Sequence, residues 1–171
     1  MIKRLAQRQL KTKYGIFDEV LYYDGTRESI ALTFGEVHGM ADLLCRIHSA
    51  CIGGHVFNSV ECQCAAEMAA AQLEIANAGS GIIIYLDQEG KGNGHLALIE
   101  SIRFKAEFGQ AKAYKMAGFS ADARDFRPAA EIIHDLGIVS VILLTENSNK
   151  AEDLRRHAVN VSGTRPLDIK L

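Results

Sequence analysis

Apolar and polar positions change period several times along the chain, which indicates alternating strands and helices. Residues 17–23 (FDEVLYY) and 29–37 (SIALTFGEV) are rich in β-branched and aromatic residues and flank the turn DGTRES. They therefore predict a β-hairpin. Residues 43–50 (LLCRIHSA) predict a third strand, and the short apolar runs at 81–86 (GIIIYL) and 139–146 (VSVILLTE) are typical of buried strands.

Helical patterns separate these strands. Strong helix formers fill AAEMAAAQLEIANAGSG, and RPAAEIIHDLG has Pro128 near its start and Gly137 just past its end. The expected helices occupy residues 65–81, 95–109, 127–137 and 149–158, and a last strand follows at 159–167. We predict an α/β fold with a mixed sheet and flanking helices, in which the early strands form the antiparallel part.

The length and net charge of the chain restrict the kinds of function that the protein can have. The chain has 171 residues, 48% of them hydrophobic, which suits one domain over residues 1–171 with a core of its own. Its net charge of -2 argues against a nucleic-acid binder. No apolar stretch approaches the ~20 residues that span a bilayer, and no signal-peptide pattern follows the basic N-terminus. We expect a cytoplasmic protein with no membrane partner.

Three of the four cysteines lie in the stretch CIGGHVFNSVECQC, where Cys51, Cys62 and Cys64 have the spacing C-x10-C-x-C. Clustered cysteines in a reducing cytosol are more often metal ligands or catalytic thiols than disulfides. Cys62 and Cys64 precede a predicted helix, whose N-terminus favours the thiolate. We predict a zinc site, because thiolates suit tetrahedral Zn²⁺. Three unrelated buried cysteines are the alternative.

The fourth ligand decides whether such a site is closed or open to substrate. Cys45 lies in a predicted strand, where six residues at ~3.3 Å each place it about 20 Å from Cys51. We therefore expect Cys45 to be a buried apolar residue. His48 and His55 are the other candidates, so a site closed by one of them is the alternative to an open position.

The loop YLDQEGKGNGH follows the predicted strand at 81–86, where open α/β sheets place ligands. Its pattern matches neither the Walker loop nor the dinucleotide fingerprint. Gly90 permits close approach of a ligand to the backbone, and Lys91 supplies a positive charge. Glu89 is suited to accept hydrogen bonds from the ring N–H and the exocyclic amine of a guanine-like ring. A solvated loop glutamate is the alternative.

Two further regions carry candidate site residues. In GFSADARDF, Asp122 can take a proton from water and Arg124 can bind a phosphate with two hydrogen bonds, although a helix cap or salt bridge is the alternative. Thr145 and Lys150 follow the strand at 139–146 and reach the same edge as Glu89 if the strands are parallel. For Lys150, a plain surface lysine stays open as an alternative.

Taken together, these regions resemble the GTP cyclohydrolase II family over residues 30–167. The runs RIHSAC, HVFNSVECQC, GIIIYLDQEGKGNG, GFSADARDF, AAEIIHDLGIVSVILLT and RPL follow in the family's order, and the cysteine spacing is the most specific part. The resemblance implies a zinc enzyme that opens the imidazole ring of GTP, releases formate and cleaves pyrophosphate from the triphosphate. It also implies a homodimer.

The resemblance assigns roles to individual residues. Cys51, Cys62 and Cys64 would hold zinc, Asp122 would be the proton acceptor, and Arg124 would engage the α-phosphate. Nucleotide-binding positions fall on Arg46, Glu67, Glu89, Gly90, Lys91, Thr145 and Lys150. A second metal such as Mg²⁺ is expected only if a triphosphate is bound.

The chain also departs from the family's pattern. Ala50 replaces a glutamate, Glu67 replaces a glutamine, and Lys91 replaces an arginine. The family's catalytic tyrosine belongs on the helix after the glycine loop, where ALIESIRFKAEFG has Ser101 or Ile102, and the next tyrosine comes only at residue 114.

We therefore predict a divergent paralogue, of specialised metabolism or pyrimidine breakdown, that opens the ring of GTP or of a related purine or heterocycle. We expect it to release formate slowly or not at all. A zinc-stabilised nucleotide-binding module without turnover is the alternative. The presence of Asp122 and Arg124 favours an enzyme, because a pure binding module has little use for a base beside the metal.

Overall fold

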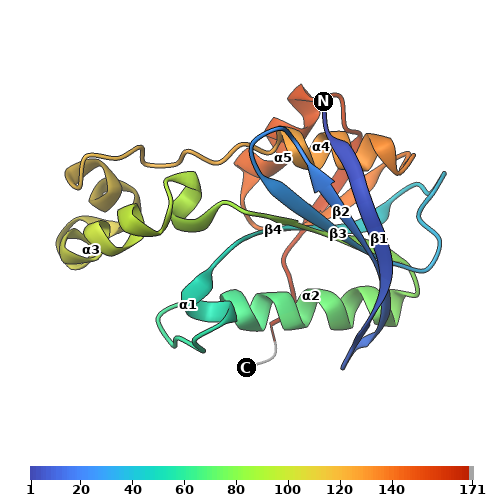
Figure 1. Ribbon diagram of the computed structural model, residues 1–171, viewed down its shortest axis with the longest axis horizontal. Helices are drawn as coiled ribbons and strands as arrows, with labels where there is room; N and C mark the ends of the chain where they lie inside the picture. Colours follow the sequence, from blue (N-terminus) through green and yellow to red (C-terminus); the bar gives the residue numbers. More distant parts are fainter. Residues whose placement is uncertain (170–171) are drawn as a thin grey trace.

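One seven-stranded mixed sheet forms the framework of the computed structural model, which describes residues 1–169 (Figure 1). The strand order is β1-β2-β3-β5-β4-β6-β7. The pairs β1/β2, β2/β3 and β3/β5 are antiparallel, whereas β5/β4, β4/β6 and β6/β7 are parallel. The strands are β1 (Lys3–Thr12), β2 (Gly15–Tyr23), β3 (Glu28–Phe34), β4 (Leu43–Ser49), β5 (Gly81–Leu86), β6 (Val141–Leu144) and β7 (Val161–Arg165).

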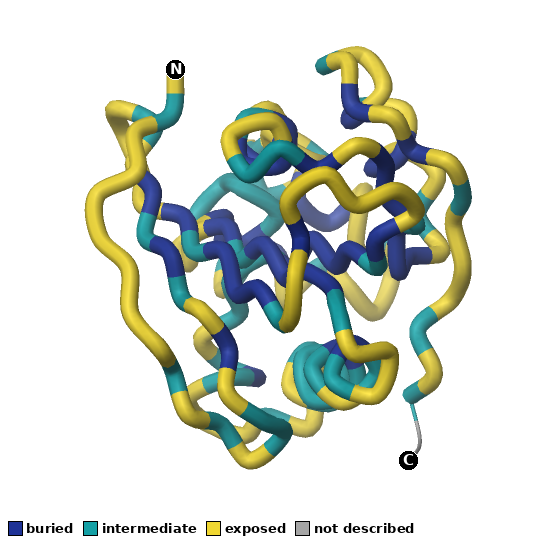
Figure 2. The backbone as a smooth tube through the Cα atoms, turned by 90° about the vertical axis from the view of Figure 1, so that its right-hand side faces the viewer, coloured by how far each residue is buried: buried dark blue, intermediate teal, exposed yellow. Residues whose placement is uncertain are grey.

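Different helices cover the two faces of the sheet. The helices are α1 (Ile52–His55), α2 (Cys64–Ala78), α3 (His95–Met116), α4 (Arg127–Asp135) and α5 (Ser148–Arg156), with a 3₁₀ turn η1 (Glu89–Gly92). On one face Ile83 packs with Ile75 of α2. On the other, Ile82 and Ile84 join a core with Ile132 of α4. Strand β5 is buried on both faces, as its continuous apolar sequence indicates. Figure 2 shows the buried backbone gathered in the middle of the molecule.

The structure confirms the predicted α/β fold, the hairpin, the buried strands and the predicted helices. Besides the short helix α1 and the turn η1, which were not predicted, it differs in two places. Strand β1 was not predicted, because it is an edge strand with mostly exposed residues and its sequence lacks the alternation of a half-buried strand. The helix expected at 95–109 continues to Met116 after a break at Gly109, whose φ of 72° and ψ of 165° interrupt the helical path.

The parallel strands determine where the candidate site residues lie. Strands β4, β5, β6 and β7 all point the same way, so their carboxyl ends meet at one edge of the sheet. The loops after β4, β5 and β6 carry Cys51, Glu89 and Thr145 respectively. The expected domain extends to residue 171, and residues 170–171 lie outside the described part. None of the described helices has the length and apolar character needed to cross a membrane.

Candidate metal centre and nucleotide cavity

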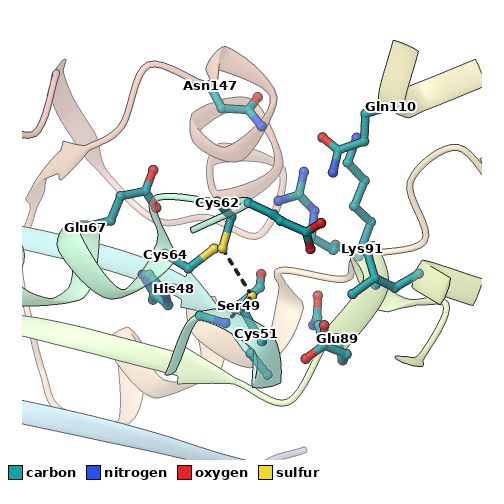
Figure 3. Close-up of a pocket in the computed structure, with 18 of the residues that line it drawn as sticks. His48, Ser49, Cys51, Cys62, Cys64, Glu67, Glu89, Lys91, Gln110 and Asn147 are labelled. Carbon is teal, nitrogen blue, oxygen red and sulfur yellow. Dashed lines mark hydrogen bonds between the residues drawn. The ribbon is translucent and has the colours of Figure 1, made fainter. Parts of the chain in front are cut away.

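A cavity of about 550 Å³ lies at the carboxyl edge of the parallel strands. It holds the three clustered cysteines and side chains from the loops after β4, β5 and β6 (Figure 3). Of the residues predicted from sequence, only Asp122 does not line it directly. Those that do are Arg46, Cys51, Cys62, Cys64, Glu67, Glu89, Gly90, Lys91, Arg124, Thr145 and Lys150.

The three cysteines come together from different elements. Cys51 follows β4 and caps α1, where its Sγ accepts the Gly54 N–H at 3.4 Å. Cys62 lies in the next loop, and Cys64 is the first residue of α2. Their sulfur atoms lie within 4.8 Å of one another, and the sulfurs of Cys51 and Cys62 are 3.6 Å apart (Figure 3).

This geometry fits a zinc ion. Tetrahedral coordination with Zn–S bonds of about 2.3 Å needs sulfur atoms about 3.8 Å apart. Gly54 gives the sulfurs room, since a Cβ there would lie 3.0 Å from the Cys62 Sγ and 3.1 Å from the Cys64 Cβ. Among residues 1–169, no His, Asp or Glu joins the three cysteines within the same distance. The cluster therefore offers three ligands and leaves a fourth position to a molecule from the cavity.

The remaining cysteine and the two histidines lie outside the cluster. Cys45 is fully buried in the core, as expected, and burial raises its pKa to about 12. His48 and His55 form a pair with their Nε2 atoms 2.9 Å apart, and the His55 Nδ1 accepts the Cys51 N–H at 3.3 Å. Burial lowers the pKa of His48 to about 3, so this ring is neutral. His55 therefore contacts the Cys51 backbone, and His48 contacts His55.

Cys62 and Cys64, the two cysteines at the N-terminus of α2, differ in the direction of their pKa shifts. Burial raises the pKa of Cys64, and the adjacent thiols of Cys62 and Cys51 raise it further. For Cys62 burial also acts to raise the pKa, but hydrogen bonds from the Cys64 N–H and thiol bring it below its usual value. The prediction for Cys64 was wrong, because burial beside two other sulfurs outweighs the helix dipole.

Glu89 is buried at the start of η1. Its Oε2 accepts the Ile52 N–H at 2.6 Å, so this carboxylate ties the loop after β5 to α1 and the cysteine loop. The other oxygen lies 3.9 Å from the His95 Nδ1. Glu89 is thus not the solvated loop residue of the alternative interpretation, because it is buried and accepts a backbone hydrogen bond.

Asp122 and Arg124 form a bidentate pair beside the cavity. The Arg124 Nε donates to the Asp122 Oδ1 at 2.9 Å, and its Nη2 donates to Oδ2 at 2.5 Å. Burial acts to raise the pKa of Asp122, but hydrogen bonds and the charge of Arg124 lower it overall. Asp122 is therefore a carboxylate at neutral pH.

The other predicted basic residue, Lys150, is also buried. Its Nζ donates to the Ile47 carbonyl at 3.1 Å. Burial lowers the pKa of Lys150 to about 8, and the charges of Arg46 and Arg124 act in the same direction. Lys150 is therefore not the plain surface lysine of the alternative interpretation.

Comparison with known proteins supports the same family over almost the entire chain. The profile of the GTP cyclohydrolase II family matches residues 3–166. The chain belongs to the GTP cyclohydrolase II family. This confirms the resemblance found in the sequence, extends it to include β1, and confirms the expectation of a hydrolase of the cyclohydrolase type.

Individual relatives agree with this family. The chain is 40% identical to GTP cyclohydrolase-2 of Streptomyces coelicolor over 97% of its length and 76% of that protein, and 36% identical to GTP cyclohydrolase-2 of Histophilus somni over 98% and 79%. It is 35% identical to the riboflavin biosynthesis protein RibBA of Bacillus cereus over 99% of the chain and 43% of RibBA. A crystal structure of RibBX, a two-domain 3,4-dihydroxy-2-butanone 4-phosphate synthase from A. baumannii, aligns with a TM-score of 0.49 at 17% identity over 85% of this chain and 34% of RibBX.

Among the cavity residues that sequence reasoning missed is Tyr114. Ser101 and Ile102 line the cavity at the positions where the family's tyrosine was expected, but Tyr114 lines it as well. A Cβ at Gly90 would lie 3.7 Å from the Tyr114 hydroxyl oxygen. The break at Gly109 reorients the end of α3, and a glycine inside a helical pattern was the available signal. Burial raises the pKa of Tyr114, so its hydroxyl is protonated at neutral pH.

The cysteine cluster makes a direct prediction for metal content. We expect about one zinc per chain in the purified protein, and we expect Cys51→Ser, Cys62→Ser and Cys64→Ser each to lose it, because two thiolates hold zinc far less tightly than three. Cys45→Ser is the matched control and should retain zinc. Metal analysis of the four variants by mass spectrometry measures this. Zinc lost from the Cys45 variant alone would contradict the assignment.

Proposed function

We propose that the protein, as one domain over residues 1–171, is a zinc-dependent hydrolase that opens the imidazole ring of a guanine nucleotide. The observation that carries the proposal is the placement of the three-cysteine cluster and the Asp122–Arg124 pair at one cavity. The names of the relatives from S. coelicolor and H. somni, GTP cyclohydrolase-2, support the substrate class.

Zinc bound at the three sulfurs would supply Lewis acidity and lower the pKa of a water molecule. Three anionic thiolates make zinc a weaker Lewis acid than three histidines do, so a protein base has more to contribute. Asp122 is suited to that role, because Arg124 keeps it ionised and fixes its orientation. The pair also keeps Arg124 at the cavity wall, where it can contact a phosphate.

Glu89 is proposed to bind the guanine edge. With its Oε2 held by the Ile52 N–H, its Oε1 can accept a hydrogen bond from a ring N–H or an exocyclic amine. Glu89 also fixes the loop that carries Cys51, through its hydrogen bond to the Ile52 N–H. This bond would therefore set the position of the guanine ring relative to the metal site.

The product depends on two hydrolytic events. One water opens the ring to a formamide, and a second releases formate from it. The hydroxyl of Tyr114 lies at the cavity, although the residues at the family's tyrosine position are Ser101 and Ile102. These departures, with Ala50 and Lys91, support a specialised paralogue whose second step is slow, since a misplaced water can slow one step while leaving another intact.

A homodimer is proposed from the surface of α3. This helix projects away from the sheet (Figure 1), and it exposes Leu96, Ile99 and Ile102 by 66%, 52% and 50%. Exposed apolar side chains grouped on one helix are typical of an interface, and two-fold dimers are the commonest oligomers.

The proposed reaction and the role of Asp122 as its base can be tested together. The zinc-loaded protein should convert a guanine compound to a product heavier by one water, with slow loss of the formyl carbon. Asp122→Asn should slow ring opening by about 10²–10⁴-fold without loss of zinc, because it cannot accept the proton. Mass spectrometry of the reaction mixture measures both. Since the pKa of Asp122 is lowered, the wild-type rate should fall only when the pH drops below the usual aspartate range.

Asp125→Asn is the matched control, since Asp125 lies in the same loop and has an exposed side chain that caps Arg127 rather than orienting Arg124. It should retain most of the rate. A protein that binds the purine and zinc but leaves every guanine compound intact would be the nucleotide-binding module of the alternative interpretation.

Glu89→Gln should weaken purine binding by about 1–3 kcal/mol, because the amide presents a mismatched group to a buried partner. Calorimetric titration with a guanine compound measures the affinity. Glu146→Gln, at a second glutamate of the cavity, is the control and should bind normally. Unchanged affinity in the Glu89 variant would remove the proposed guanine contact.

The dimer is checked by light scattering during size-exclusion chromatography. We expect twice the mass of one chain, and we expect Ile99→Glu to lower the mass toward that of a monomer, because a buried unpaired carboxylate is costly at an interface. Lys105→Glu, on the same helix, controls for the charge change. A monomeric wild-type protein at micromolar concentration would end the dimer proposal.

A further inference from the structure

Two histidines, His48 and His55, form a pair between two cavities. His48 lies in β4 and lines the nucleotide cavity (Figure 3), whereas His55 ends α1 and lines a second cavity of about 450 Å³, to which α2 and the antiparallel strands contribute. Their Nε2 atoms are 2.9 Å apart, and the Tyr85 ring lies 6.4 Å from the His48 ring and 5.9 Å from the His55 ring, centroid to centroid. The pair is therefore held in one arrangement by packing.

The hydrogen bonds of this pair determine which ring nitrogens carry hydrogen. The His55 Nδ1 accepts the Cys51 N–H at 3.3 Å, so it carries none itself. An imidazole has at least one N–H, which in His55 must then be on Nε2. The His55 Nε2 therefore donates to the His48 Nε2, which must be bare to accept. The single hydrogen of the His48 ring is thus on Nδ1.

The Nδ1–H of His48 is left without a partner inside the protein. His48 is 2% exposed, and among residues 1–169 its Nδ1 has no hydrogen-bond partner. A buried N–H without a partner is costly, so such groups are rare in native proteins. Because His48 lines the nucleotide cavity, a ligand bound there can accept this hydrogen.

The surroundings of His48 favour an acceptor that carries negative charge. Burial lowers the pKa of His48 to about 3, and the positive charges of Arg46 and Lys150 act in the same direction. The ring therefore stays neutral at physiological pH and offers one N–H beside two cations. An anionic oxygen suits such a position, because hydrogen bonds to charged acceptors are the stronger ones.

We infer that His48 donates from Nδ1 to an oxygen of the bound nucleotide, and that His55 is a positioning residue that fixes His48 in this tautomer. Two hydrogen bonds, from the Cys51 N–H to His55 and from His55 to His48, connect the loop of the metal ligands to this donor. The inference rests on the proposed function and adds a substrate contact to its site.

Nuclear magnetic resonance tests the tautomers directly and needs no substrate. In zinc-loaded protein with isotope-labelled histidine, the chemical shifts of the ring nitrogens distinguish an Nδ1–H ring from an Nε2–H ring. We expect the hydrogen on Nδ1 in His48 and on Nε2 in His55. Signals are assigned by their loss in His48→Phe and His55→Phe. The opposite tautomer at either ring would overturn the inference.

Exchanges at His55 separate positioning from packing. His55→Gln keeps an N–H donor toward the His48 Nε2, so His48 should stay in the Nδ1–H form and the Kd of GTP should change by less than about twofold. His55→Phe keeps a ring but has no donor, so both tautomers of His48 should appear and the Kd should rise by about fivefold. A His48 tautomer that is unchanged in His55→Phe would overturn the positioning role.

Exchanges at His48 test the contact with the nucleotide. His48→Phe keeps a ring next to Tyr85 but has no N–H, so it should raise the Kd of GTP by about tenfold or more. His48→Asn places an amide N–H near the position of Nδ1 and should recover most of this loss. His134→Gln, at an exposed position of α4, is the control and should bind like the wild type. Zinc content is measured for each variant, and only zinc-loaded proteins are compared.

The outcomes separate this inference from the proposed function. Unchanged GTP affinity in zinc-loaded His48→Phe would remove the nucleotide contact, while the cyclohydrolase proposal would stand. An equal loss of affinity in His48→Phe and His48→Asn would likewise count against the Nδ1 donor. Wild-type protein that binds no GTP would contradict the proposed function and the nucleotide contact together, whereas the tautomers would still decide the role of His55.

Discussion

The burial of β5 between two helical layers is the constraint on which the site depends. Gly81 begins this strand because a side chain there would press on Ile75, with a Cβ 2.8 Å from two of its carbons. The strand pairs antiparallel to β3 and parallel to β4, so it joins the N-terminal hairpin to the parallel part of the sheet. Its end must therefore lie beside the end of β4, which places Glu89 next to the cysteine loop.

Contacts between loops then fix the position of Asp122, the proposed base. The Gln88 side chain donates to the Asp125 carbonyl at 2.5 Å and accepts the Asp125 N–H at 3.2 Å. The Ala123 N–H donates to the Lys91 carbonyl at 2.9 Å, and Gly92 has a φ of 83° where a Cβ would lie 2.6 Å from the Ala123 oxygen. These hydrogen bonds from the Gln88 side chain and from the backbone position Asp122 and Arg124, which explains how a loop without regular structure can hold the proposed base in place.

The features that could be predicted from the sequence are those that depend on residues close together in the chain. Apolar runs identified the buried strands, and the spacing of Cys51, Cys62 and Cys64 identified their cluster, because both depend on residues close in the chain. The pairing of Arg46 with Glu67 joins residues 21 positions apart on different elements, so no pattern indicated it. Tyr114 was missed because its position depends on the backbone break at Gly109 rather than on periodicity.

The cysteine cluster also links the metal to the fold around it. The loop between Cys51 and Cys64 exposes apolar side chains, among them Phe57 at 72% and Val60 at 98%, so hydrophobic burial contributes little to holding it. Its ends are held by Glu89 at Ile52 and by the start of α2. A cation bound by the three sulfurs would release the remaining thiol protons and would connect both ends of the loop. The same ion that supplies the chemistry would thereby fix the wall of the cavity in which the substrate sits.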